Sequence, residues 1–199
     1  RVDKHGVQQR LVLSAPKGSN SLPFMVWSAG QREFVPLLLG LYWLLPPTKT
    51  PRRGAIEWVV IEEPEMGLHP KAVSAVLFLV LDLLSRGYRV CLSTHSPHVL
   101  DVVWAINVLR EQHAPPGRLL DLFEVEARAD LTKMAAAALE KSTRVYYFEP
   151  ASGVARDISN LDPGSGDAAE AGWGGLTEFT GRVADVVASV VNGSHARSK

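Results

Sequence analysis

Short apolar runs in the middle of this chain alternate with longer apolar segments of helical length. The runs at residues 56–61 (IEWVVI) and 88–94 (YRVCLST) are typical of short strands buried on both faces, as in the middle of a parallel sheet. A helix is expected after each strand, over residues 70 to about 86 and 97 to about 110. Each of these segments begins with a proline, Pro70 or Pro97, and proline suits the first helical position. This strand–helix–strand–helix order predicts an α/β fold with a parallel sheet.

A third apolar segment, Phe34–Leu45, precedes the first of these strands. It is apolar nearly all round, which predicts a buried helix. Ser28 with Gln31 three residues later is a capping-box pattern, so the helix should begin there. Pro36 should kink this helix, unless the helix starts after it.

Weaker patterns at the two ends of the chain predict several further elements. Short strands are expected at 10–14 and 22–27, joined by the turn-rich 15–21. The Pro-rich 113–117 is expected to be a linker and the Gly- and Asp-rich 162–175 a mobile loop. The remaining expected elements are a helix at 127–141, a hairpin of strands at 144–149 and 154–158, and a packed amphipathic helix that carries Leu176, Phe179, Val183, Val187 and Val190.

Composition places the chain among soluble globular proteins, with 199 residues and 46% hydrophobic content. Lys+Arg and Asp+Glu balance at 21 each, so no net charge favours nucleic acid or an anionic membrane. The single cysteine, Cys91, excludes an intrachain disulfide, fits a reducing compartment and is expected to be a buried strand residue. No apolar segment reaches the roughly 20 residues of a membrane-spanning helix, and a cytoplasmic location is expected.

Acidic residues follow the strand at 56–61. Glu62, Glu63 and Glu65 lie at or just beyond its carboxyl end, the edge where ligands bind in open α/β sheets. One carboxylate can hold hydrated Mg²⁺ while its neighbour orients a water for attack on a phosphoryl group. On this stretch alone, a strand that runs into a solvated acidic loop explains the residues equally well.

Two other candidate features lie at the ends of predicted elements. Ser28–Gln31 can be an ordinary capping box, and His95, between a strand and a capped helix, can be a hydrogen-bonded loop residue. Their occurrence in a fixed order with Glu62 and Glu63 is much harder to explain in this way.

Four segments together resemble the ATP-binding-cassette class of P-loop ATPases. Residues 27–31 (WSAGQ) look like the signature motif, 59–63 (VVIEE) like Walker B with its catalytic glutamate, 65–70 (EMGLHP) like the D-loop, and 93–96 (STHS) like the switch-histidine segment. The sequences of these motifs resemble the soluble branch of the class more than they resemble transporter subunits. That branch includes RecF/SMC-like ATPases and the overcoming-lysogenization-defect (OLD) family.

The resemblance implies a role for each candidate residue in a P-loop NTPase-like fold. Glu62 would hold Mg²⁺ through its water shell, where the family more often has Asp; Glu63 would polarise the attacking water, and His95 would contact the γ-phosphate. The active unit would be a head-to-head dimer, with ATP sandwiched between subunits. The anion site that reaches ATP on the opposite subunit would be formed by Ser28, Ala29, Gly30 and Gln31.

The chain departs from the family in one respect: no G-x-x-x-x-G-K-[ST] motif occurs in it. The segment most similar to this motif is Lys17-Gly18-Ser19, and a hairpin turn explains it better. An N-terminal half with Walker A is therefore expected upstream of Arg1 or on another chain. Residues 1–112 would carry the signature, Walker B and switch-histidine part of the ATPase domain, and 113–199 its C-terminal helices and hairpin. Alone, this C-terminal half should bind ATP weakly and hydrolyse it negligibly.

The leading functional prediction is a cytoplasmic ATPase whose nucleotide-driven dimerisation works a partner or effector, in phage defence or DNA maintenance. The alternative is a non-catalytic cassette-like module that pairs with an active ATPase subunit; a transporter's ATP-binding subunit is a third reading. DNA binding is a weaker hypothesis, since solvated loop charges also explain the basic residues concerned. These residues are Lys49, Arg52 and Arg53 in one loop, with Arg1, Lys4 and Arg10 near the start.

Overall fold

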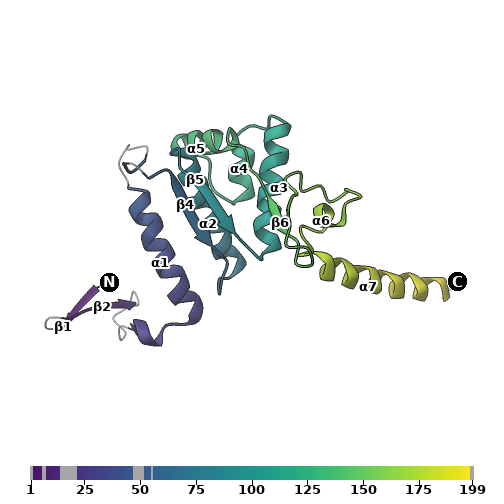
Figure 1. The fold of residues 1–199 in the computed structure, drawn as a ribbon, viewed down its shortest axis with the longest axis horizontal. Helices are drawn as coiled ribbons and strands as arrows, with labels where there is room; N and C mark the ends of the chain where they lie inside the picture. The colour runs from purple at the N-terminus through teal and green to yellow at the C-terminus, as the bar shows by residue number, and fades with distance from the viewer. Residues whose placement is uncertain (1, 6–7, 14–21, 47–51, 55, 198–199) are drawn as a thin grey trace. The chain divides into compact units, whose positions relative to one another are not determined.

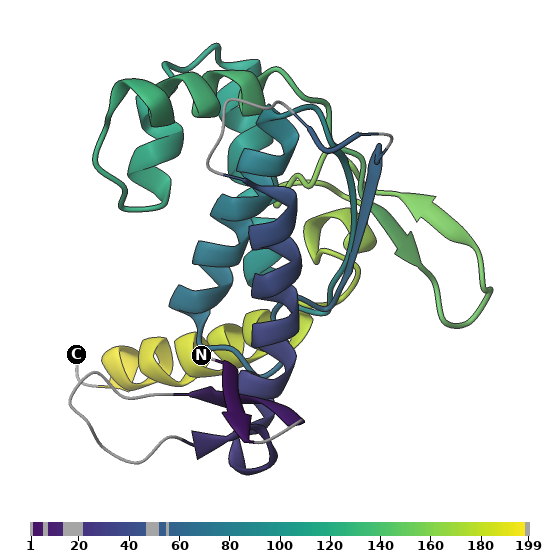
Figure 2. The same ribbon diagram turned by 90° about the vertical axis from the view of Figure 1, so that its left-hand side faces the viewer.

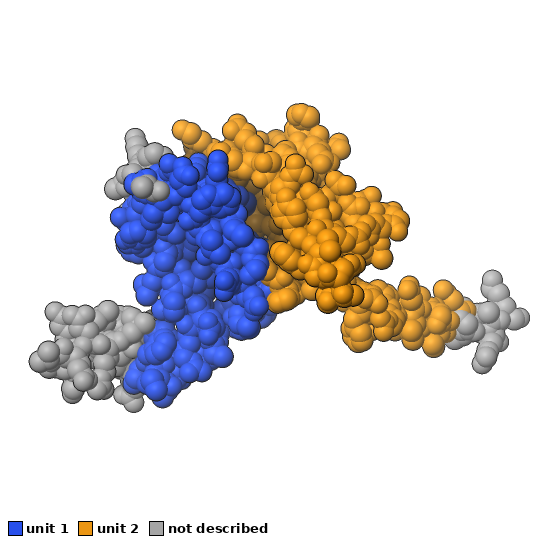
Figure 3. Space-filling model, in the orientation of Figure 1, with its two compact units in different colours: residues 1–93 blue, residues 94–199 orange. Residues whose placement is uncertain are grey.

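The computed structural model describes residues 2–5, 8–13, 22–46, 52–54 and 56–197. It divides the chain into two compact units, residues 1–93 and 94–199 (Figure 3). Helices and short strands occur in both units (Figure 1), so the expected α/β class is confirmed. The expected division of the motifs at residue 112 stays a prediction.

The first unit opens with an antiparallel sheet in the order β1–β2–β3. A single 3₁₀ turn then leads to the long helix α1. Strand β2 falls where a strand was predicted, whereas β1 was not predicted. The strand predicted at 22–27 is wrong beyond Pro23, because Phe24–Val26 form the 3₁₀ turn. Residues 14–21, with Lys17-Gly18-Ser19, lie outside the described residues. The elements are β1 (Val2–His5), β2 (Gln8–Leu13), β3 (Leu22–Pro23), the turn Phe24–Val26 and α1 (Ala29–Leu44).

The second half of this unit is a strand–helix–strand segment of β4 (Trp58–Glu62), α2 (Pro70–Ser85) and β5 (Arg89–Ser93). The two strands pair in parallel, with Trp58 opposite Arg89 and Glu62 opposite Ser93. The parallel pair and its connecting helix confirm the prediction made from the alternation of apolar runs.

The core of the first unit lies between β4, β5, α1 and α2, and Figure 2 shows α1 and α2 alongside one another. Buried side chains recur on α2 at helical spacing, so one face of this helix covers the sheet. Burying each such side chain stabilises the fold by about 1.5–3 kcal/mol. The buried members of this core are Leu41, Ile61, Val76, Val80, Leu83 and Tyr88.

The prediction that β4 and β5 are buried on both faces is wrong for this chain. Trp58 is 57% exposed and Val60 67%, whereas Ile61, on the opposite face of β4, is buried. Cys91, predicted to be buried, is also exposed. The physical reason is that α2 covers one face only and that, within the described residues, β4 and β5 pair only with each other.

The expectation of a buried α1 also needs correction. The helix starts at Ala29, as the capping box predicted, and it runs without a break across Pro36. Only Leu41 is buried, while Leu39, Tyr42 and Trp43 are exposed. A helix that is apolar all round therefore packs here on a single side.

The second unit begins with three helices, followed by the antiparallel β6–β7 hairpin (Figure 2) and two further helices. The helices near 97–110 and 127–141 and the hairpin were predicted; α4 was not, because only a Pro-rich linker was recognised at 113–117 and no element after it. The elements are α3 (Pro97–Glu111), α4 (Gly117–Leu122), α5 (Ala129–Leu139), β6 (Tyr146–Phe148), β7 (Ala155–Asp157), α6 (Ala168–Ala171) and α7 (Glu178–Arg197).

Two expectations for the end of the chain are wrong. The segment 162–175, expected to be a mobile loop, contains α6 and places Trp173 in a buried cluster with Leu161. The apolar stripe of α7, expected to pack, is exposed from Phe179 to Val191. None of the described helices is both long and apolar enough to cross a membrane.

Candidate functional site

The carboxyl end of β4 carries two of the predicted site residues. Register places Glu62 opposite Ser93, the last residue of β5. The Glu63 backbone N–H donates to the Ser93 carbonyl oxygen at 3.0 Å, so the strand pairing continues one residue beyond β4. Both carboxylates therefore stand at the carboxyl edge of a parallel pair, with Glu62 exposed and Glu63 half-buried.

Glu63 has a left-handed backbone, with φ of 43°. This conformation costs a residue with a Cβ about 1–3 kcal/mol, and residues held in it cluster at functional sites. The turn that begins at Glu63 is closed by the Met66 N–H, which donates to the Glu63 carbonyl at 2.9 Å. The strained residue is therefore fixed by hydrogen bonds on both sides.

The loop from Glu63 to His69 leads directly into α2. The Leu68 N–H donates to the Glu65 carbonyl at 3.0 Å, which makes a second turn inside the loop. His69 caps α2, because its Nδ1 accepts from the Lys71 N–H at 3.2 Å, and Pro70 occupies the first helical turn. The loop is thus anchored at one end to β5 and at the other to α2.

The start of α1 is a complete capping box, as the sequence predicted. The Ser28 Oγ accepts from the Gln31 N–H at 3.3 Å, and the Gln31 Oε1 accepts from the Ser28 N–H at 3.0 Å. Ala29 and Gly30 occupy the next positions, where backbone N–H groups have no carbonyl partner within the helix. The positive end of the helix dipole coincides with these groups, which suits an anion.

The structure brings this helix start against the acidic loop after β4, residues 63–69, of the same chain. Gly30 lies in backbone contact with Gly67, and no side chain separates the two segments. The predicted signature segment and the loop after Glu63 therefore meet within the first unit. Sequence reasoning did not find this contact, and no local pattern signals it.

His95, the fourth predicted site element, stands two residues after Ser93, at the start of the second unit. Its side chain is exposed, in a segment turned by the Thr94 Oγ1, which accepts from the Ser96 N–H at 2.9 Å. Ser96 occupies the N-cap position of α3, as predicted, without a side-chain bond to the helix. One turn into α3, burial raises the pKa of Asp101, and the neighbouring His98 opposes this rise.

The described part of the basic loop is engaged in internal contacts. Arg52 lies 3.8 Å from Glu57. The backbone N–H of Arg53 donates to the Tyr88 hydroxyl at 2.8 Å, and its guanidinium lies over the Trp43 ring and donates to the Trp43 carbonyl. These contacts favour a structural role over DNA binding for Arg53. Arg1 and Lys49 lie outside the described residues.

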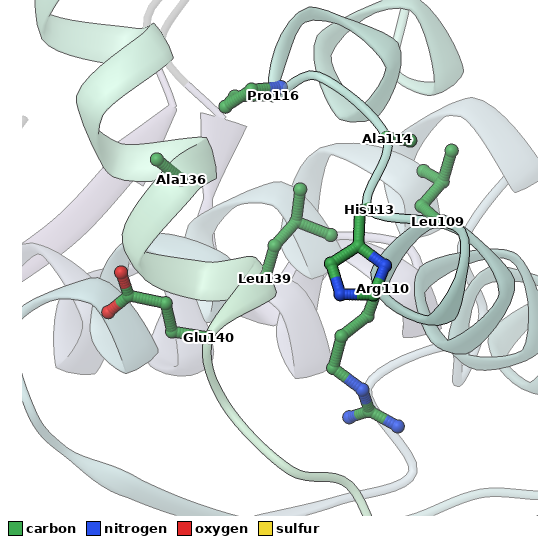
Figure 4. Close-up of a pocket in the computed structure, with 8 residues that line it drawn as sticks. All are labelled: Leu109, Arg110, His113, Ala114, Pro116, Ala136, Leu139 and Glu140. Atoms are coloured by element: carbon green, nitrogen blue, oxygen red, sulfur yellow. The ribbon is translucent and has the colours of Figure 1, made fainter.

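The second unit contains a pocket of about 430 Å³ between the end of α3 and α5 (Figure 4). Its walls are largely apolar, and the guanidinium of Arg110 donates a hydrogen bond to the Lys141 carbonyl oxygen at 2.9 Å. None of the predicted site residues lines it. The lining residues are Leu109, Arg110, His113, Ala114, Pro116, Ala136, Leu139 and Glu140.

Among the described residues, no group of three or more His, Cys, Asp or Glu side chains is arranged to hold a metal ion. Mg²⁺ in phosphoryl-transfer sites is usually held by one or two carboxylates together with substrate phosphates and water. Glu62 ends β4 and Glu63 follows it, so two carboxylates stand at this strand end.

Two comparisons with known proteins gave matches. Residues 6–101, which include the start of α1, β4, α2, β5 and His95, match the family model described as "AAA domain, putative AbiEii toxin, Type IV TA system". Over 52 residues, the chain is 38% identical to the Old nuclease of Escherichia phage P2. The aligned segment is 26% of this chain and 9% of that relative, so the chain spans under a tenth of the relative's length. No solved structure matches the chain significantly.

The two likenesses and the α/β structure are compatible with a P-loop NTPase-like fold for the matched segment.

Proposed function

We propose that this chain forms the signature-motif, Walker B and switch-histidine portion of an ABC-type ATPase. The observation that carries the proposal is the carboxyl edge of β4 and β5, where two successive glutamates adjoin Ser93 and a histidine follows two residues later. The strained backbone at Glu63 supports it, because an acid held at energetic cost is typical of a working site.

In this proposal each residue acts on one part of the nucleotide. Glu62 holds Mg²⁺ through water, and the ion supplies charge that stabilises the phosphates. Glu63 accepts a proton from the water that attacks the γ-phosphate, and His95 contacts that phosphate. The helix start at Ser28–Gln31 offers its backbone N–H groups to the nucleotide of a second subunit, so that two copies, or this chain and a cassette partner, complete each site.

The uncovered face of β4 and β5 supports the further proposal that the P-loop lies on a segment that joins this sheet. Parallel sheets are almost always covered on both faces. Here Trp58, Val60 and Cys91 are exposed on one face, and the pair has no other strand beside it within the described residues. Strands and helices of a nucleotide-binding half would cover these side chains and supply the P-loop.

The effector of this ATPase is part of the proposal as well. The relative from phage P2 is named a nuclease, so nucleic-acid cleavage is the effector activity to test first, in the setting of phage defence or DNA maintenance.

The absence of a P-loop motif from the 199 residues favours a second candidate, a non-catalytic module that pairs with an active ATPase subunit.

Glu63→Gln, in a full-length protein that unites this chain with its P-loop half, tests the proposal. The variant should bind ATP as the wild type does, lose turnover by at least about a hundredfold, and accumulate as an ATP-bound dimer. Glu57→Gln, an exposed glutamate just before β4, is the matched control and should hydrolyse ATP normally. Wild-type turnover in Glu63→Gln would exclude Glu63 as the catalytic carboxylate.

A further inference from the structure

Two glycines far apart in the sequence meet backbone to backbone in the first unit. A Cβ placed on Gly30 would collide with the Gly67 carbonyl oxygen and lie 2.9 Å from its carbonyl carbon. A Cβ placed on Gly67 would lie 2.7 Å from the Gly30 Cα and 3.0 Å from its nitrogen. Neighbouring atoms this close are backbone atoms, which cannot rotate away, so neither position accepts a side chain without separating the two segments.

Gly67 has a second reason to be glycine, because its φ of +66° lies in the left-handed region. Hydrogen bonds restrain the loop around it. It is tied to β5 through the Glu63 N–H and to α2 through the His69 cap, with two turns closed by hydrogen bonds in between. Gly67 is therefore a fixed point, against which Gly30 sets the position of the start of α1.

We infer that the Gly30–Gly67 contact is a positioning device that holds the Ser28–Gln31 helix start in one fixed place relative to the acidic loop after β4. A change at either segment is then transmitted to the other through the backbone. The consequence for catalysis rests on the proposed function, whereas the contact itself does not. Gly30 is accordingly a positioning residue, and its lack of a side chain serves the packing of this chain against itself.

Amide hydrogen exchange on the present chain tests the contact without any activity assay. Gly30→Ala should make amides of the 63–69 loop exchange about tenfold faster, because the added methyl group must push the loop away. Gly40→Ala is the matched control: it lies in the same helix, and a Cβ there meets nothing within 4 Å. It should leave the 63–69 loop unchanged.

Gly67→Ala should produce the reciprocal result, faster exchange at residues 28–32. Part of its effect comes from the left-handed backbone alone. Gly153→Ala shows how much a left-handed alanine by itself speeds amide exchange in its own surroundings, because Gly153 has the same φ of +66° and open space around it. Peptides from α3 report on overall folding. If Gly30→Ala unfolds the chain, Ser28→Ala loosens the helix start without adding atoms and should also speed exchange in the 63–69 loop. Unchanged exchange in that loop with a folded variant would overturn the inference.

The catalytic consequence is measured in the full-length protein. Gly30→Ala should lower kcat for ATP about tenfold and leave KM within about twofold, because the P-loop half binds the nucleotide while the contact orients the helix start. Gly40→Ala should leave both constants unchanged. An unchanged kcat in Gly30→Ala, with the 63–69 loop loosened, would overturn the positioning role. Wild-type turnover in Glu63→Gln would instead defeat the proposed function and leave the contact to be judged by exchange alone.

Discussion

The two faces of the β4–β5 sheet carry similar apolar residues but have different surroundings. On one face Val59, Ile61 and Val90 pack against α2 and Leu41 of α1. On the other face Trp58 and Val60 are exposed, and the Arg89 guanidinium lies 5.5 Å from the centre of the Trp58 ring.

The difference shows which face of this parallel pair has a covering helix among the described residues. The face toward α2 has its covering helix, whereas the opposite face exposes Trp58, Val60 and Cys91 beside the charged Arg89. Exposed apolar patches of this kind mark interaction sites, and an uncovered parallel sheet is uncommon. The contrast makes different predictions for substitutions on the two sides.

The largest effect is expected on the covered side, for Leu83→Ala. Leu83 is 0% exposed, so truncation removes buried contacts and leaves a cavity, at a cost of about 2–5 kcal/mol in the free energy of unfolding. Leu39→Ala is the matched control on α1, where the leucine is 53% exposed, and it should cost under about 1 kcal/mol. Urea unfolding followed by circular dichroism measures both. Equal costs would mean that α2 does not cover a core.

A smaller effect is expected for Tyr88→Phe, at the start of β5. The buried Tyr88 hydroxyl accepts from the Arg53 N–H at 2.8 Å and donates to the Leu44 carbonyl at 3.1 Å, which ties the end of α1 to the covered face. Its removal leaves both partners unsatisfied and should cost about 1–2 kcal/mol. Tyr42→Phe, with a ring 72% exposed, should be neutral in the same urea unfolding measurement. A neutral Tyr88→Phe would show that water replaces both bonds.

Local sequence patterns were sufficient to predict the order of elements around the candidate site. Pro70 and Pro97 marked helix starts, Ser28 and Gln31 formed the expected capping box, and the two apolar runs became parallel strands. Each of these features depends on residues within a few positions of one another. This is why they can be recognised without knowledge of the rest of the molecule.

What covers an element depends on distant residues, and there the predictions failed. An unbroken apolar run such as Trp58–Ile61 shows no alternation, so it cannot reveal that one face is uncovered. The same reason explains the exposed Cys91. The apolar spacing in α7 predicts an amphipathic helix, but it does not show whether distant residues cover the apolar stripe, which is exposed. The Gly30–Gly67 contact was not predictable for a related reason, since each glycine taken alone looks like an ordinary turn or helix-start residue.

The smallest expected effect separates the two faces within a single strand. Val60→Thr keeps the shape and β-branching of valine and adds one hydroxyl, which water can satisfy on the exposed face. It should change the free energy of unfolding by less than about 0.5 kcal/mol. Val59→Thr places the same hydroxyl against the core and should cost about 1–3 kcal/mol.

Joining the chain to its proposed P-loop half should make Val60→Thr destabilising. Val60 would then be buried, and Val60→Thr should approach the cost of Val59→Thr, because its hydroxyl loses water without gaining a partner. Thermal or urea unfolding of both variants, with and without that half, measures the change. If Val60→Thr stays neutral in the longer protein, the proposal that the sheet continues on this exposed face is wrong.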